Sequence, residues 1–109
     1  MKIVKGITAS SGVAKGSALV IKDPMQATSV SAGNYIVVAP YTTPLLNIIL
    51  LNAKGIVCET GGMTTHAAII SRELNIPCVM SAQGIMNQVQ NGQIVEIKAE
   101  SGEVIIYDE

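Results

Sequence analysis

The central part of the chain alternates short apolar runs with segments of helical pattern, and this alternation constrains the fold more than any other feature. A run of apolar residues without polar interruption, such as Tyr35–Ala39, is typical of a strand that is buried on both faces. The pattern predicts strands at 35–39, 56–59 and 78–80, separated by helices at 44–53 and 66–74. The fold class indicated is a mixed α/β domain, and the length of 109 residues predicts a single domain, 1–109.

Both ends of the chain carry strand patterns instead of helical ones. Strands are predicted at 3–7, 17–21, 93–98 and 103–107, with a helical turn at 84–89. The small residues of 10–16 and the polar stretch 23–33 are expected to be connections. Ser101 and Gly102 fall between the last two strands and predict a hairpin.

Residues that favour helix ends bound both predicted helices. Thr43 is suited to be the N-cap of the first helix, with Pro44 at the favoured first position. Asn75 can end the second helix in a left-handed conformation, and Pro77 prevents its continuation.

The single histidine of the chain, His66, lies where the second helix is predicted to begin. It closes the run Gly61-Gly-Met-Thr-Thr-His66, which joins a buried strand to that helix. The start of a helix carries unpaired backbone N–H groups and the positive end of the helix dipole, and both attract anions. An imidazole in this place suggests a histidine that carries a phosphoryl group.

Phosphoryl transfer through histidine requires a neutral imidazole with one nitrogen held, so that the other nitrogen presents its lone pair. It also requires donors for the phosphate oxygens. Thr64 and Thr65 can supply hydroxyl groups, and Gly61 and Gly62 allow a close approach that a side chain would block. These four residues and His66 form the candidate site.

Several residues around the histidine leave more than one interpretation open. Thr43 is a weaker candidate for phosphate binding, if its helix start faces the same end of the sheet, or it is a plain N-cap. Glu59 can orient the imidazole ring or be a solvated turn residue. Arg72 lies about two turns along the helix and on another side, so we expect a solvated or packing role. His66 itself can be a surface or core-edge residue.

Composition argues against several classes of function. The seven basic and eight acidic residues give a net charge of −1 and form no basic cluster, so no nucleic-acid surface is predicted. The longest apolar stretch, 44–51, is too short to span a membrane and is broken by Asn47. The first residues lack a signal-peptide pattern, and the cytoplasm is the expected location.

The two cysteines, Cys58 and Cys78, both lie in apolar strand-like runs and are expected to be buried free thiols. A disulfide between them fits poorly with a chain that lacks a secretion signal. A metal site would need both cysteines to converge with His66, and their spacing matches no zinc pattern. No metal site is therefore predicted.

The segment from Gly55 to Met80 resembles the motif of a known family. It contains Gly61-Gly-Met-Thr-Thr-His-Ala-Ala-Ile-Ile-Ser-Arg-Glu-Leu-Asn-Ile-Pro77. This string is similar to Gly-Gly-x-Thr-Ser-His-Ala-Ala-Ile-x-Ala-Arg-Glu-x-Gly-Ile-Pro, found in the phosphohistidine, or swivelling, domain of phosphoenolpyruvate-utilising enzymes. Pyruvate phosphate dikinase, phosphoenolpyruvate synthase, enzyme I of the sugar phosphotransferase system and rifampicin phosphotransferase belong to that family. The resemblance extends to both ends of the chain, through 6–16, 38–44, 91–92 and 101–104.

The resemblance implies a β/β/α swivelling fold with mixed sheets and two main helices. It also implies that His66 receives a phosphoryl group and relays it between two partner active sites. In the family these sites are an ATP-grasp nucleotide-binding domain and a phosphoenolpyruvate/pyruvate barrel, which we expect here on separate chains. Magnesium and ATP or phosphoenolpyruvate would bind to those partner domains, and no cofactor is expected on this chain. The chain would then be a phosphotransferase component that is catalytically incomplete alone.

Three positions depart from the usual motif of the family. Thr65 replaces a serine, Ser71 replaces an alanine and Asn75 replaces a glycine, and none of these changes removes the chemistry. The main alternative is a non-catalytic regulatory module that retains the fold. A third interpretation is an anion-binding module that uses the glycine turn without covalent chemistry.

Overall fold

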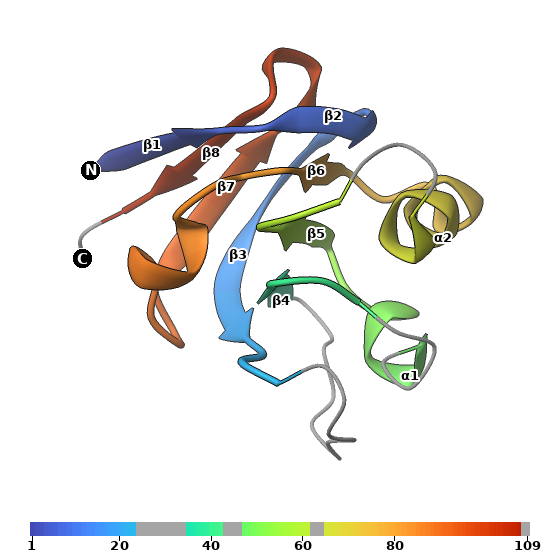
Figure 1. Cartoon of the computed structure of the whole chain (residues 1–109), viewed down its shortest axis with the longest axis horizontal. Helices are drawn as coiled ribbons and strands as arrows, with labels where there is room; N and C mark the ends of the chain where they lie inside the picture. Colours follow the sequence, from blue (N-terminus) through green and yellow to red (C-terminus); the bar gives the residue numbers. More distant parts are fainter. Residues whose placement is uncertain (24–34, 43–46, 62–64, 108–109) are drawn as a thin grey trace.

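The computed structural model describes residues 1–23, 35–42, 47–61 and 65–107. These residues form one sheet of eight strands with helices beside it (Figure 1). The strands are β1 (Lys2–Lys5), β2 (Ile7–Ser10), β3 (Val13–Val20), β4 (Tyr35–Ala39), β5 (Gly55–Cys58), β6 (Cys78–Met80), β7 (Ile94–Lys98) and β8 (Glu103–Ile106). The helices are α1 (Asn47–Leu50), α2 (His66–Leu74) and the 3₁₀ helices η2 (Ile85–Asn87) and η3 (Ala99–Ser101).

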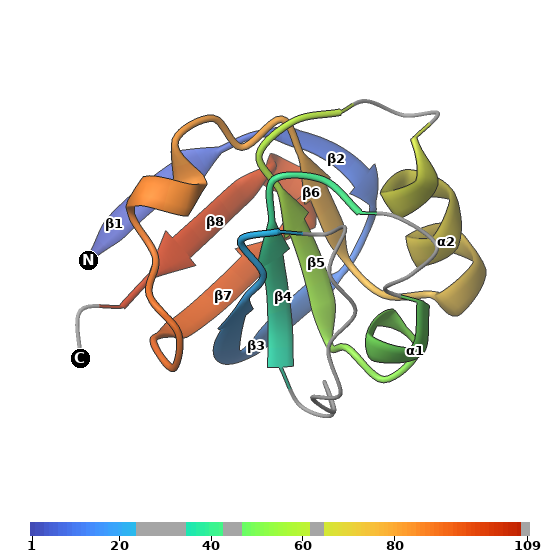
Figure 2. The ribbon, with the colours of Figure 1, turned by 60° about the horizontal axis from the view of Figure 1, so that its bottom comes forward.

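The sheet is mixed, with strand order β1-β8-β7-β3-β4-β5-β6-β2. Its centre, β3 to β6, is parallel, and antiparallel strands extend it on both sides. The connections from β4 to β5 and from β5 to β6 contain α1 and α2, which lie on the same side of these strands (Figure 2). The predicted alternation of strands and helices is confirmed, and the expected sheets are joined into one.

The two edge strands, β1 and β2, are consecutive parts of one extended segment that runs across the other strands (Figure 1). Because β1 pairs with β8 and β2 pairs with β6, this segment closes the sheet around a core. Gly6 lies between the two strands and donates its N–H to the Gly102 carbonyl at 2.8 Å. A Cβ on Gly6 would collide with the carbonyl oxygen of Met80. This close approach divides the single strand predicted at 3–7 into β1 and β2.

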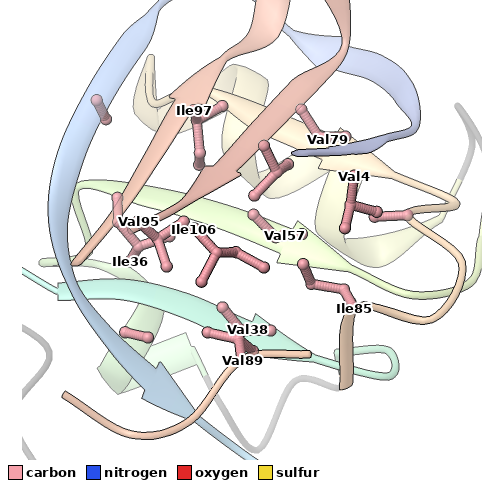
Figure 3. Close-up of a cluster of buried hydrophobic side chains, with 14 of the residues drawn as sticks. Val4, Ile36, Val38, Val57, Val79, Ile85, Val89, Val95, Ile97 and Ile106 are labelled. Carbon is pink, nitrogen blue, oxygen red and sulfur yellow. The ribbon is translucent and has the colours of Figure 1, made fainter. Parts of the chain in front are cut away.

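The parallel strands are buried on both faces, so the core has an inner and an outer compartment. Along β4, Ile36 and Val38 belong to the inner cluster, whereas Val37 and Ala39 belong to the outer cluster. Figure 3 shows the inner cluster surrounded by strands of the curved sheet. The outer cluster includes buried side chains of both α-helices. The prediction of a strand buried on both faces at 35–39 is confirmed.

The small residues of 10–16 belong largely to a strand, and the loop predicted there is wrong. β3 begins at Val13 and pairs with β7, which places Ala14 opposite Ile97 and Gly16 opposite Val95. Ala14, Val95 and Ile97 all belong to the inner cluster. Packing between strands therefore overrides the local composition.

The second predicted helix has the bounds expected for it, and Asn75 ends it with φ 59°. The first helix ends at Leu50, and a turn continues from there to Ala53. Of the two main helices predicted, α2 is the longer in the described part of the chain, with nine residues. The predicted start of the first helix and the connection at 24–33 lie outside the described residues. No helix of the described ranges is long and apolar enough to cross a membrane.

Candidate functional site

The connections that follow β4 and β5 leave the sheet side by side (Figure 2). The N–H of Glu59 donates to the carbonyl of Ala39 at 3.0 Å. Thr60 donates to the carbonyl of Pro40 from its N–H at 3.1 Å and from its hydroxyl at 2.8 Å. In parallel sheets ligands bind beyond the carboxyl ends of the strands. The paired exits therefore form the edge at which a site is expected.

His66 is the first residue of α2, as the sequence predicted. Thr65 precedes it in an extended conformation, with φ −76° and ψ 165°, and its side chain forms no capping hydrogen bond. The imidazole therefore lies at the positive end of the helix dipole, where the first N–H groups have no partner within the helix. The side chain of His66 is partly exposed.

A threonine from the other connection holds the imidazole ring. Thr42 Oγ1 lies 2.7 Å from His66 Nδ1, within hydrogen-bond distance. Thr42 follows β4 and His66 begins α2 after β5, so this contact joins the two connections across the strand exits. Because Nδ1 is engaged by the hydroxyl, the two ring nitrogens are chemically distinct.

The environment of His66 favours its neutral form. Partial burial lowers the pKa of the imidazole below its ordinary value of 6.5. Desolvation has this direction because it penalises the charged imidazolium. At pH 7 the ring is therefore largely neutral, which is the form that can act as a nucleophile.

Gly61 has a backbone conformation that favours glycine. Its φ is +103°, a conformation that L side chains rarely adopt. A Cβ at this position would lie 2.7 Å from Met80 Cε and 3.1 Å from Thr65 Cγ2. The carbonyl of Gly61 accepts a 2.6 Å hydrogen bond from Ser81 Oγ.

A cavity of about 160 Å³ opens between the two connections, next to the residues that flank the histidine. It is lined by residues from the exits of β4 and β5, the start of α2 and the end of β6, namely Tyr41, Thr42, Thr60, Gly61, Thr65, Ala67 and Met80. Pockets that hold drug-sized ligands have volumes of about 300–1,000 Å³. This smaller cavity has the scale of a compact group such as phosphate.

The structure brings three of the predicted site residues together, namely His66, Thr65 and Gly61. The other three, Thr43, Gly62 and Thr64, lie outside the described residues. Their assignment to the site stays a prediction.

Glu59 has neither of the roles considered for it from the sequence. Its carboxylate Oε2 accepts hydrogen bonds from the N–H of Gly84 at 3.1 Å and of Met86 at 3.4 Å. It therefore fixes the start of η2 to the end of β5. Arg72 donates from Nε to the carbonyl of Ala9 at 2.9 Å, which ties α2 to β2 and agrees with the packing role expected for it.

Cys58 and Cys78 are buried free thiols, as predicted. Burial raises the pKa of both thiols, that of Cys78 to about 11, so both are protonated at neutral pH. In the described part of the chain, no group of three or more His, Cys, Asp and Glu residues could hold a metal ion.

Sequence reasoning missed Thr42 and chose its neighbour Thr43. Two adjacent threonines have nearly the same local propensities, and no periodic pattern separates them in a connection. One signal in the sequence could have found Thr42. It follows the strand predicted at 35–39, and the next predicted strand, 56–59, leads to His66. That signal becomes decisive only when the pairing of β4 with β5 is known.

Comparison with known proteins identifies the relatives of this chain. A family model described as the mobile domain of PEP-utilising enzymes matches residues 32–102. The chain is 36% identical over 101 residues to the uncharacterized phosphotransferase YvkC of Bacillus subtilis, covering 93% of this chain and 12% of that protein. It is 37% identical over 106 residues to a probable phosphoenolpyruvate synthase of Methanothermobacter thermautotrophicus, covering 97% of this chain and 15% of that protein.

A solution structure of an Enzyme I protein matches with a TM-score of 0.63 and 28% identity, over 74% of this chain and 33% of that chain. The curated relatives are much longer proteins, and the chain corresponds to one small part of each. The residues matched by the family model include Thr42, Gly61, His66 and Ser81. The chain therefore belongs to the mobile-domain family of phosphoenolpyruvate-utilising enzymes.

Proposed function

We propose that this chain is a phosphoryl carrier in which His66 accepts a phosphoryl group at Nε2 and passes it to a second site. The observation that carries the proposal is the 2.7 Å contact between Thr42 Oγ1 and His66 Nδ1. The Thr42 hydroxyl restrains the ring at Nδ1 and so limits its orientation. The histidine also lies where a helix start and two strand exits favour an anion.

The transfer is a displacement at phosphorus in each direction. The lone pair of neutral Nε2 attacks the phosphorus, the bond to the bridging oxygen of the donor breaks, and the donor leaves with that electron pair. The Nδ1 proton stays in a hydrogen bond to the Thr42 hydroxyl. In the second transfer the acceptor oxygen attacks phosphorus, and the electrons of the N–P bond return to Nε2.

The groups around the histidine would stabilise the phosphoryl oxygens. The first N–H groups of α2 and the Thr65 hydroxyl are the proposed donors, and Gly61 leaves room for the group. Thr64, Gly62 and, more weakly, Thr43 are the further contacts proposed from the sequence. Donors held in place before the reaction stabilise developing charge without reorganisation.

The lengths of the relatives support a division of labour between domains. Because the chain covers only 12% and 15% of two relatives, most of each relative lies in other domains. We assign phosphoryl donation and final acceptance to an ATP-grasp domain and a phosphoenolpyruvate/pyruvate barrel on separate chains. Magnesium and ATP or phosphoenolpyruvate would bind there, and the carrier would visit both.

The test uses a relative as donor in trans. The phosphoenolpyruvate synthase of Methanothermobacter thermautotrophicus, with its own motif histidine replaced by alanine, is incubated with phosphoryl-labelled phosphoenolpyruvate and this chain. We expect label on the wild-type chain and none on His66→Ala. The label should be lost in acid and retained in base, because phosphohistidine is acid-labile.

The isolated mobile domain of the synthase is the positive control. If that domain is labelled and this chain is not, the carrier proposal is wrong. Acid-stable label that persists in His66→Ala would identify a hydroxyl as the acceptor instead. Binding of inorganic phosphate without any labelling would favour the alternative of an anion-binding module.

A further inference from the structure

We propose that Ser81 is a positioning residue of the phosphoryl-accepting site, and that it acts by holding the carbonyl of Gly61, the first residue of the run 61–66 that ends at the histidine. The inference rests on the proposed function, because it assigns Ser81 a role in that transfer. Ser81 follows β6 and lies outside the glycine–histidine motif.

The backbone conformation of Ser81 is the first observation. In the described ranges, the non-glycine residues with positive φ are Asn75, at 59°, and Ser81, at 55°. Asn75 ends α2, a place where a left-handed residue is ordinary. Ser81 does not end a helix, and glycine would adopt its conformation with less strain. A strained residue persists where the surrounding structure fixes its conformation.

The side chain of Ser81 makes a contact that glycine could not make. Its hydroxyl donates to the carbonyl of Gly61 at 2.6 Å, and the residue is partly buried. Gly61 lines the cavity beside the histidine, and an added Cβ there would meet Met80 and Thr65. The position of Gly61 therefore sets one wall of the cavity.

The connection that carries Ser81 is itself firmly attached to the end of β5. The N–H of Ala82 donates to the carbonyl of Cys58 at 3.0 Å. The carboxylate of Glu59 accepts from the N–H groups of Gly84 and Met86. These hydrogen bonds fix the backbone next to Ser81. The hydrogen bond from the Ser81 hydroxyl then restrains the position of Gly61.

The expected effect is on the rate of transfer and less on the fold. Because the peptide group is planar, holding the carbonyl of Gly61 fixes the orientation of the backbone at that point. Gly61 lies next to Thr65, whose hydroxyl is one of the proposed donors to the phosphoryl group. A displacement of about 1 Å in the groups that position a reaction can slow it about 100-fold. Loss of the Ser81 hydroxyl should therefore slow phosphoryl acceptance while the closed sheet stays intact.

The experiment compares Ser81→Gly and Ser81→Ala with wild type, with Asn75→Gly as the matched control. Ser81→Gly removes the hydroxyl and the strain together, whereas Ser81→Ala removes only the hydroxyl. Asn75→Gly makes the same kind of change at the other left-handed residue. The measured quantities are the rate of His66 phosphorylation by phosphoramidate and the hydrogen exchange of the amides of Gly61, Thr65 and His66.

We expect both Ser81 variants to accept the phosphoryl group at least fivefold more slowly than wild type. The amides of Gly61, Thr65 and His66 should exchange faster, whereas the exchange rates of the amides in β7 and β8 should stay the same. Asn75→Gly should match wild type in both measurements. Normal phosphorylation rates in both Ser81 variants would overturn the proposal, even if the amides exchange faster. Absence of phosphorylation in wild type would instead refute the carrier function, whereas the exchange data would still report the contact with Gly61.

Discussion

The hydroxyl of Thr42 contacts the imidazole of His66 and restrains its orientation. Thr42 Oγ1 lies 2.7 Å from Nδ1. When Nδ1 carries the proton, Nδ1–H donates a hydrogen bond to the hydroxyl, and Nε2 presents its lone pair to the phosphoryl donor. A hydroxyl can also donate, so the contact is compatible with both tautomers, and the proposed transfer uses the one with the proton on Nδ1.

Replacing Thr42 by valine tests this role, because valine keeps the shape and removes the hydroxyl. A net hydrogen bond contributes about 1 kcal/mol, so we expect a loss of about fivefold to tenfold in the rate of phosphoryl acceptance. A larger share of the product should also carry phosphate on Nδ1, which ³¹P NMR distinguishes. Thr42→Ser keeps the hydroxyl and should retain most of the rate, and an equal loss in both variants would contradict this assignment.

The pH dependence of acceptance follows from the lowered pKa of His66. Neutral imidazole is the nucleophile, so the rate should rise with pH through a value below 6.5 and be constant at neutral pH. Because the chain has a single histidine, NMR titration gives its pKa without ambiguity. A pKa above 6.5 would show that the ring is held in its charged form.

The same shift makes a small contribution to stability, and its sign is fixed. Between the lowered pKa of the folded state and 6.5, the unfolded state binds more protons, so stability rises with pH. The contribution is fully present above pH 6.5 and is lost as the pH falls through the folded pKa. Thermal melts at several pH values should show this slope in wild type and a smaller slope in His66→Gln.

Helix α2 combines a polar start with a buried face of small residues. Its buried residues are Ala67, Ala68 and Ser71, whereas Ile69 remains 48% exposed. Small side chains let the helix lie close to the strands, and Ser71 satisfies its hydroxyl through the carbonyl of Ala68 at 3.0 Å. Because His66 is the first residue of α2, this packing also fixes its position relative to the ends of β4 and β5.

Asn75 ends α2 in a left-handed conformation, with its N–H donating to the carbonyl of Arg72 at 3.3 Å. Alanine in this conformation is strained, and we expect Asn75→Ala to lower the free energy of unfolding by about 1 kcal/mol. Denaturant titration measures the loss, and Asn75→Gly should stay close to wild type. Equal losses in both variants would show that the asparagine side chain, and not the backbone conformation, sets the stability.

At the scale of the whole molecule, the closed sheet of the described residues supports the site. The segment of β1 and β2 joins both ends of the strand order, and the inner cluster fills the space within (Figure 3). Thr8 adds a hydrogen bond from its hydroxyl to the carbonyl of Ala99, between β2 and η3. Under the proposed function, such a support would keep the geometry of the site the same at each partner.

Gly6→Ala tests the closure, because the added Cβ would meet the carbonyl of Met80 and a methyl group of Val79. Backbone must shift to relieve these contacts, and we expect a loss of about 1–3 kcal/mol in the free energy of unfolding. Thermal melting should show a clear decrease, whereas Lys5→Ala, at an exposed neighbour, should melt close to wild type. A melting temperature unchanged by Gly6→Ala would show that the backbone at Gly6 does not pack tightly against Met80.

Local patterns in the sequence determined the central elements and the place of the histidine. The apolar run at 35–39 and the short run at 78–80 are the strands predicted, because uninterrupted apolar residues can only be satisfied between two packed faces. Asn75 and Pro77 end α2 where expected, because their backbone preferences act within a few residues. The motif around His66 likewise identified the family, since its residues are contiguous.

Only the tertiary structure decided which groups surround the histidine. Thr42 reaches His66 across 24 residues of sequence, Ser81 reaches Gly61 across 20, and Glu59 reaches Gly84 across 25. Each contact exists because paired strands bring the connections that follow them close together. Local composition does not indicate which strands pair. For the same reason Gly6 divides a strand and Ala14 lies within one, since the deciding neighbours, Met80 and Ile97, are distant in sequence.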